Sequence, residues 1–209
     1  MSTAPGGKLS LRDRKKAATR RALIEAAEQL FEERGFDAVT VAEIADAANV
    51  SVKTMFVYFR TKEDLVFADN ELIESLVAAV RDRPAGSAPA DAIVRVLSAA
   101  IDPQHVQEGL EGFHRGYGQS LALESGLLRL WADFENQLTA VLAAEAGGTA
   151  TPSMRALAMQ LVALVRLMTS DEMRLAVAAK APRTAARDVR AALDAAAAAV
   201  KRAYPTEGN

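Results

Sequence analysis

Apolar residues recur along most of the chain at the three- and four-residue spacing of amphipathic helices. In the segment 11–34, Leu23, Ala27, Leu30 and Phe31 fall on one helical face. Further segments of the same character are 41–48, 52–58, 62–81, 90–101, 104–123, 126–145, 152–179 and 184–203. No stretch of the sequence alternates with the period of two that a half-buried strand needs. The pattern therefore predicts an all-α protein of about nine helices.

Turn-forming residues divide this helical pattern into segments. Residues 1–10 are small and polar with Gly and Pro, and we expect them to be a disordered tail. Residues 11–60 contain three helical segments, and 61–83 form a linking helix that ends at a Pro- and Gly-containing break. Residues 84–204 then form a C-terminal helical bundle. Two domains joined by a helix are therefore predicted.

The segment 40–65 has the layout of a helix-turn-helix. Thr40 and Glu43 are spaced as a capping box, which starts a short helix. Asn49 tolerates the left-handed backbone of a sharp turn, and Ser51 is a good N-cap for a second helix. A short amphipathic second helix in this layout places its side chains in the DNA major groove. The segment is therefore a candidate DNA-reading unit.

The second helix of this segment carries the candidate DNA contacts. Lys53 has the chemistry to bind guanine O6 and N7 or a phosphate, and Thr54 to bind a phosphate or touch a thymine methyl group. The outward residues predicted for this helix are Ser51, Val52, Lys53, Thr54, Val57 and Tyr58.

The charge distribution supports a local nucleic-acid surface. The chain of 209 residues has a formal net charge of −2, which does not fit a protein that coats nucleic acid generally. The segment 8–21, however, holds seven basic residues against the single acid Asp13, so that it carries +6 and the remainder −8. A phosphate-facing patch near the N-terminus is therefore expected.

Composition sets the remaining bounds. The chain has no cysteine, which fits a cytoplasmic location, and no apolar run of the roughly 18 residues needed to span a membrane. His105 and His114 are not spaced as metal ligands, and Asp133 and Glu135 point to different faces of one helix. We therefore expect no metal, no cofactor, no membrane association and no enzymatic activity.

Four pieces of the sequence, in this order and spacing, resemble the tetracycline-repressor-like (TetR) family of transcriptional regulators. They are Thr40-Val41-Ala42-Glu43-Ile44-Ala45, Asn49-Val50-Ser51, Thr54-Met55-Phe56-Val57-Tyr58-Phe59 and Lys62-Glu63-Asp64-Leu65. The resemblance covers about the first third of the chain. It implies that Thr40, Tyr58 and Lys62 grip DNA phosphates. Phe56 stands where the family often has Tyr, and Val57 where it often has a polar residue. These two differences can change which DNA sequence is recognised.

The same resemblance implies a small-molecule pocket in the C-terminal domain and a homodimer formed by the last two helices. The aromatic and Met side chains suggested for the pocket can equally fill the core; they are Phe113, Tyr117, Trp131, Phe134 and Met168. The dimer stripe, which can also face the protein's own core, is Leu157, Leu161, Leu164, Val189, Leu193 and Val200.

The function expected is that of a repressor, released from a palindromic double-stranded DNA operator by a small apolar or amphipathic effector. Two alternatives stay open from the sequence. One is a DNA-binding protein without small-molecule input, and the other is an all-α enzyme that contains this motif.

Overall fold

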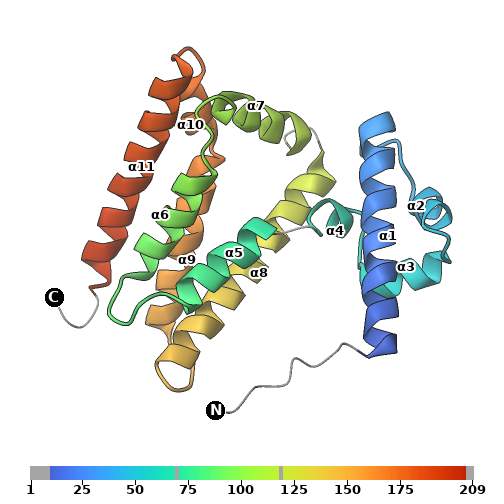
Figure 1. Cartoon of the computed structure of the whole chain (residues 1–209), viewed down its shortest axis with the longest axis horizontal. Coiled ribbons are helices and arrows are strands. Elements are labelled where there is room, and N and C mark those ends of the chain that lie inside the picture. Colours follow the sequence, from blue (N-terminus) through green and yellow to red (C-terminus); the bar gives the residue numbers. More distant parts are fainter. Residues whose placement is uncertain (1–9, 69–70, 118–119, 206–209) are drawn as a thin grey trace, which may run out of the picture. The chain divides into compact units, whose positions relative to one another are not determined.

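The computed structural model describes residues 10–68, 71–117 and 120–205, with the side chains of residues 115–117 outside this description. These residues form eleven helices and no strand, which confirms the predicted all-α class (Figure 1). The disordered tail predicted for residues 1–10 lies, apart from Ser10, outside the described residues.

The chain divides into two compact units, Met1–Asp69 and Asn70–Asn209. The N-terminal unit holds α1 (Leu11–Arg34), α2 (Val41–Ala47), α3 (Val52–Tyr58) and α4 (Glu63–Val66). The C-terminal unit holds α5 (Glu71–Arg81), α6 (Pro89–Ala100), α7 (Val106–Tyr117), α8 (Leu121–Glu145), α9 (Pro152–Met168), α10 (Asp171–Val177) and α11 (Pro182–Ala203).

One apolar cluster holds the N-terminal unit together. It consists of Leu23, Ile24, Ala27, Val39, Ile44, Ala45, Met55, Phe59 and Leu65. Because α2 and α3 each contribute buried side chains, α2 packs onto α1 and α3 packs onto α2 (Figure 1). Phe36 is only half-buried, and its ring centroid lies 5.2 Å from that of Phe31.

In the C-terminal unit, α9 is the central element and packs against α6, α8 and α11 (Figure 1). The fully buried side chains here include Leu76, Ile93, Leu97, Phe134, Leu138, Leu161, Leu164 and Leu193. The turn between α5 and α6 is fastened by Arg83, whose guanidinium donates to the carbonyls of Val80 and Ser87 and to the Glu145 carboxylate at 2.6–2.9 Å.

Two predicted helices are each two helices in the structure, which raises the number from about nine to eleven. The segment predicted from 62 to 81 contains α4 and α5, and α4 ends at Val66. The Ala68 carbonyl just beyond it accepts a hydrogen bond from Arg20 at 2.8 Å, a tertiary contact in place of a helical one. The segment predicted from 152 to 179 contains α9 and α10, because the Ser170 hydroxyl accepts from the Met173 amide and starts a new helix.

None of the described helices is both long and apolar enough to cross a lipid bilayer.

Candidate functional site

Local capping interactions set the geometry of the helix-turn-helix. The Thr40 side chain accepts from the Glu43 amide, and the Glu43 carboxylate accepts from the Thr40 amide at 2.8 Å, so the predicted capping box is present. Asn49 has a φ of 54°, the left-handed turn expected between the two helices. The Ser51 hydroxyl accepts from the Thr54 amide at 3.0 Å, which caps α3.

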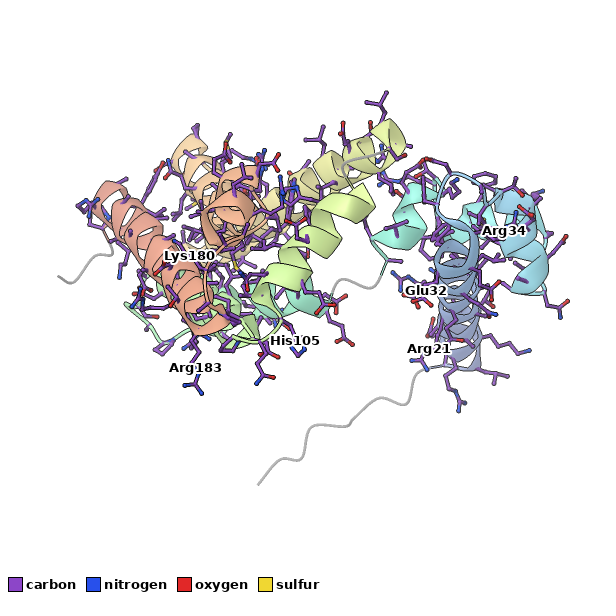
Figure 2. The ribbon with its side chains drawn as sticks, turned by 90° about the horizontal axis from the view of Figure 1, so that it is seen from above. Arg21, Glu32, Arg34, His105, Lys180 and Arg183 are labelled. Carbon is purple, nitrogen blue, oxygen red and sulfur yellow. The ribbon has the colours of Figure 1, made fainter. Side chains whose placement is uncertain are left out.

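The Glu43 carboxylate also forms an ion pair that connects α2 to α1. It accepts from the Thr40 hydroxyl at 2.7 Å and pairs with the Arg34 guanidinium at 2.8 Å. Arg34, which is labelled in Figure 2, is the last residue of α1. The hydrogen bonds from Thr40 and then the contact with Arg34 favour the charged form and lower the pKa of Glu43 to about 2. The start of α2 is thereby tied to the end of α1.

The exposed side of α3 contains the residues predicted to face outward. Ser51, Val52, Lys53 and Val57 are exposed, while Thr54 and Tyr58 are partly buried. Their contacts with DNA stay a prediction. The outward residues predicted from the sequence did not include Phe56, whose side chain is 51% exposed. Its position four residues after Val52, on the same side of the helix, was the available signal.

The basic start of α1 and the end of α3 border the same groove. The groove has a volume of about 930 Å³ and is lined by Leu11, Arg12, Asp13, Lys15, Lys16, Thr19, Val57 and Tyr58. Arg12, Lys15 and Lys16 are exposed. The fold therefore brings these three cations of the segment 8–21 to the helix predicted to read bases. Lys8 lies outside the described residues.

Lys62 is held inside the N-terminal unit. Its ammonium donates to the carbonyls of Phe36 and Val39 at 2.7 and 2.9 Å, and it lies 4.0 Å from the centroid of the Phe36 ring. These contacts join the α3–α4 connection to the loop before α2. Lys62 therefore has a structural role that the sequence did not indicate. Its contact with a DNA phosphate stays a prediction.

The C-terminal unit contains two hollows that share Phe113 of α7 and Thr169. The larger, of about 690 Å³, is lined by Phe113, Glu124, Leu127, Leu128, Trp131, Ala163, Arg166, Leu167, Thr169, Ser170, Asp171 and Glu172. The smaller, of about 270 Å³, is lined by Ala100, Ile101, Asp102, His105, Val106, Gly109, Leu110, Phe113, Met168, Thr169 and Val189. Of the predicted pocket residues, Phe113, Trp131 and Met168 therefore line hollows.

The outcome differs for the other two predicted pocket residues. Phe134 is fully buried in the core and is not among the residues that line these two hollows, so its place in a pocket stays a prediction. The Tyr117 side chain lies outside the described residues.

Two histidines lie at or beside the hollows. His105, labelled in Figure 2, lies at the smaller hollow. Its Nδ1 is 2.7 Å from an Asp102 carboxylate oxygen, and this hydrogen bond raises the pKa of His105. His114 is next to Phe113, and its Nδ1 lies 3.6 Å from Asp171. Among the described side chains, His114 Nε2 is the one buried polar atom that has no hydrogen-bond partner.

The structure corrects the residues predicted for a dimer interface. Five of them are at most 5% exposed in the protomer, namely Leu161, Leu164, Val189, Leu193 and Val200. Their stripe faces the core between α6, α9 and α11, so it offers no surface to a second copy. Leu157 is partly buried against the same core.

The three-helix core, the capped turn and the exposed α3 together define a helix-turn-helix protein. The family model described as bacterial regulatory proteins, tetR family, matches residues 23–68. The HTH-type transcriptional regulator TcmR of Streptomyces glaucescens is 33% identical over 147 residues, which are 66% of this chain and 64% of TcmR. The chain belongs to the tetR family of bacterial regulatory proteins. It matches somewhat less than two thirds of the length of this curated relative.

Solved structures similar to this chain include GusR of Salmonella enterica and a TetR-family regulator of Streptomyces coelicolor. The first is 21% identical with a TM-score of 0.46, over 86% of this chain and 95% of GusR. The second is 25% identical with a TM-score of 0.42, over 92% of this chain and 99% of the other.

The position of Lys62 predicts a stability effect separate from any effect on DNA. Lys62→Met keeps the aliphatic stem but removes the ammonium that donates to the Phe36 and Val39 carbonyls. We expect it to destabilise the N-terminal unit by about 1–3 kcal/mol. Hydrogen exchange of the α2 and α3 amides measures this locally, and faster exchange is expected. Lys53→Met, at an exposed lysine of α3, is the matched control and should leave the exchange unchanged. Equal protection in both variants would contradict the structural role.

The lowered pKa of Glu43 predicts a pH-dependent contribution to stability. Since the folded pKa of about 2 lies below the ordinary 4.5, the contribution is complete above pH 4.5 and is lost as the pH falls toward 2. The melting temperature of Glu43→Gln should therefore lie below that of the wild type near pH 7, and the gap should narrow between about pH 4.5 and about pH 3. Glu25→Gln, an exposed carboxylate of α1, serves as control. A gap that does not change with pH would refute the assignment.

Proposed function

We propose that the protein is a sequence-specific, DNA-binding transcriptional regulator that acts on DNA in the cytoplasm. The observation that carries the proposal is the shared groove of α1 and α3, in which exposed cations flank the outward side of a capped helix. In a helix-turn-helix, the second helix enters the major groove and its N-terminal residues contact base edges. Lys53 lies at that end of α3.

Phosphate and base contacts have different consequences in this arrangement. The exposed cations Arg12, Lys15 and Lys16 supply affinity and fix the register on the duplex, since phosphate contacts carry no direct sequence information. Thr40, Ser51 and Tyr58 add hydroxyl groups suited to the same role. Lys53, Thr54 and Val57, together with Val52, are the side chains that select bases.

We further propose that the protein acts as a homodimer on a palindromic operator. A single α3 reads only a few base pairs, whereas a two-fold dimer presents two such helices about 34 Å apart, one turn of DNA. Because the predicted stripe is buried, we place the dimer surface on the outward side of α9 and α11. Met159 is 54% exposed there, and Ala191, Ala195 and Ala199 are exposed at four-residue spacing on α11.

A small, largely apolar effector is the input that the C-terminal unit supports. The hollow of about 270 Å³ is close to the lower end of the roughly 300–1,000 Å³ of ordinary ligand sites, and that of about 690 Å³ lies well within it. The unpaired Nε2 of His114, beside Phe113 and Asp171, is a polar atom that a ligand can satisfy. As a repressor released by its effector, the protein needs a difference of about 1–3 kcal/mol between the effector's binding to the two states.

A fluorescence-anisotropy titration with the duplex upstream of its own gene tests DNA recognition. We expect a preference of about 10³-fold or more over random duplex, together with a strong salt dependence. Replacing both Lys15 and Lys16 with Ala should weaken binding to all duplexes and reduce the salt slope by about two. Lys53→Ala should in addition relax the preference at one or two base pairs. If the wild type bound the upstream duplex and random duplex with equal affinity, the proposal would be overturned.

Thermal unfolding with a panel of one- and two-ring aromatic compounds tests the effector input. A compound that binds the native state should raise the melting temperature and lower the affinity for the operator. Phe113→Ala should remove both effects, because Phe113 borders both hollows. Leu175→Ala, an exposed side chain of α10, should keep them. Stabilisation without any change in operator affinity would favour the alternative, a DNA-binding protein without small-molecule input.

A further inference from the structure

The exposed side of α3 is apolar to a degree that its own packing does not explain. Val52, Phe56 and Val57 are 39%, 51% and 72% exposed on a helix of only seven residues. Isolated exposed apolar residues are ordinary on protein surfaces, but a group of them on one short helix indicates a binding surface. The core contact of this helix is made by Met55, which is fully buried.

Helical geometry places the three residues next to one another. At 100° per residue, Val52, Phe56, Lys53 and Val57 follow each other within an arc of about 140°. The centre of that arc points away from Met55. The outward side of α3 is therefore an apolar strip in which Lys53 is the charged member.

The surroundings of the strip indicate what it contacts. Val57 lines the same groove as Arg12, Lys15 and Lys16, so an apolar surface adjoins a row of exposed cations. The complementary partner carries regularly spaced negative charges next to apolar groups. Duplex DNA offers this combination in its major groove, where the 5-methyl group of thymine is the apolar feature between the phosphate rows.

We infer that α3 reads thymine through its 5-methyl groups, with Val57 and Phe56 as the contacting residues. The inference rests on the proposed DNA-binding function and specifies which base features are read. Lys53, between them on the helix, supplies the neighbouring polar contact. Each half-site of the operator then has thymine where these two side chains face the groove, and Val52 extends the apolar strip toward the N-terminal end of α3.

This kind of recognition has a size that can be measured. Deoxyuridine differs from thymidine only by the missing methyl group and pairs with the same hydrogen bonds. Removing one methyl that is buried against an apolar side chain is expected to weaken binding about fourfold. A methyl group that only lies in solvent should give no measurable change.

The test starts from the full chain and a library of random duplexes. Duplexes enriched by repeated selection define the preferred sequence, and each of its thymines is then replaced singly by deoxyuridine. Affinity is measured by anisotropy for the wild type, Val57→Ala and Phe56→Ala. The control is Leu175→Ala, a truncation of an exposed apolar residue on α10 of the C-terminal unit. Val57 is the more exposed of the two, so Val57→Ala stays interpretable even if Phe56→Ala disturbs the fold.

We expect one or two thymines per half-site at which deoxyuridine weakens wild-type binding about fourfold. At one of these positions, Val57→Ala or Phe56→Ala should bind the duplex with deoxyuridine as tightly as the duplex with thymidine. Leu175→Ala should keep the difference that the wild type shows. The inference would be overturned if deoxyuridine did not weaken binding to the enriched sequences, or if it weakened the binding of all four proteins equally. Either outcome would leave the proposed DNA recognition intact. A selection that enriches no sequence at all would overturn the proposed function, and this inference with it.

Discussion

The surface of the N-terminal unit depends on helices too short to be stable alone. Both α2 and α3 have seven residues, whereas isolated helices below roughly 12–15 residues are marginal in water. Their ends are therefore held by side chains, Glu43 and Thr40 at α2 and Ser51 at α3. Lys62 adds a clamp from beyond α3 to the loop before α2. The direction of every exposed side chain on α3 follows from these contacts and from the buried Met55.

In the C-terminal unit, α7 borders both hollows and contains glycines that lower its intrinsic tendency to form a helix. An added Cβ at Gly109 or Gly112 of α7 would meet no atom within 4 Å, so close packing does not require glycine at either position. Each glycine costs a helix roughly 1 kcal/mol relative to alanine. Side chains hold α7 instead, since Gln107 donates to the carbonyls of Val177 and Lys180. A helix of this kind is expected to open locally at lower cost than its neighbours.

The features that could be predicted from the sequence are those that nearby residues decide. Thr40 with Glu43, and Ser51 with Thr54, are three residues apart, so their caps follow from spacing, and the left-handed turn at Asn49 follows from residue type. The role of Lys62 could not be predicted, because its partners lie 23 and 26 residues earlier in the chain. The sequence predicted that Leu161 belongs to an apolar stripe on one face of its helix. Its periodicity is the same whether it faces the protomer's own core or a second copy, and only the packing of α6, α8 and α11 around α9 decides.

The same distinction governs the charges, because a basic residue near a helix-turn-helix can serve either the protein or its ligand. Arg20 belongs to the basic segment 8–21, yet it donates to the Ala68 carbonyl and its guanidinium carbon lies 5.4 Å from the centroid of the Phe59 ring. Its charge helps to hold α1 to the residues after α4. Arg12, Lys15 and Lys16 are exposed around the groove that reaches Val57. A count of charges therefore overstates the number of cations available to phosphates. Burial and hydrogen bonding decide which cations stabilise the fold of the N-terminal unit instead.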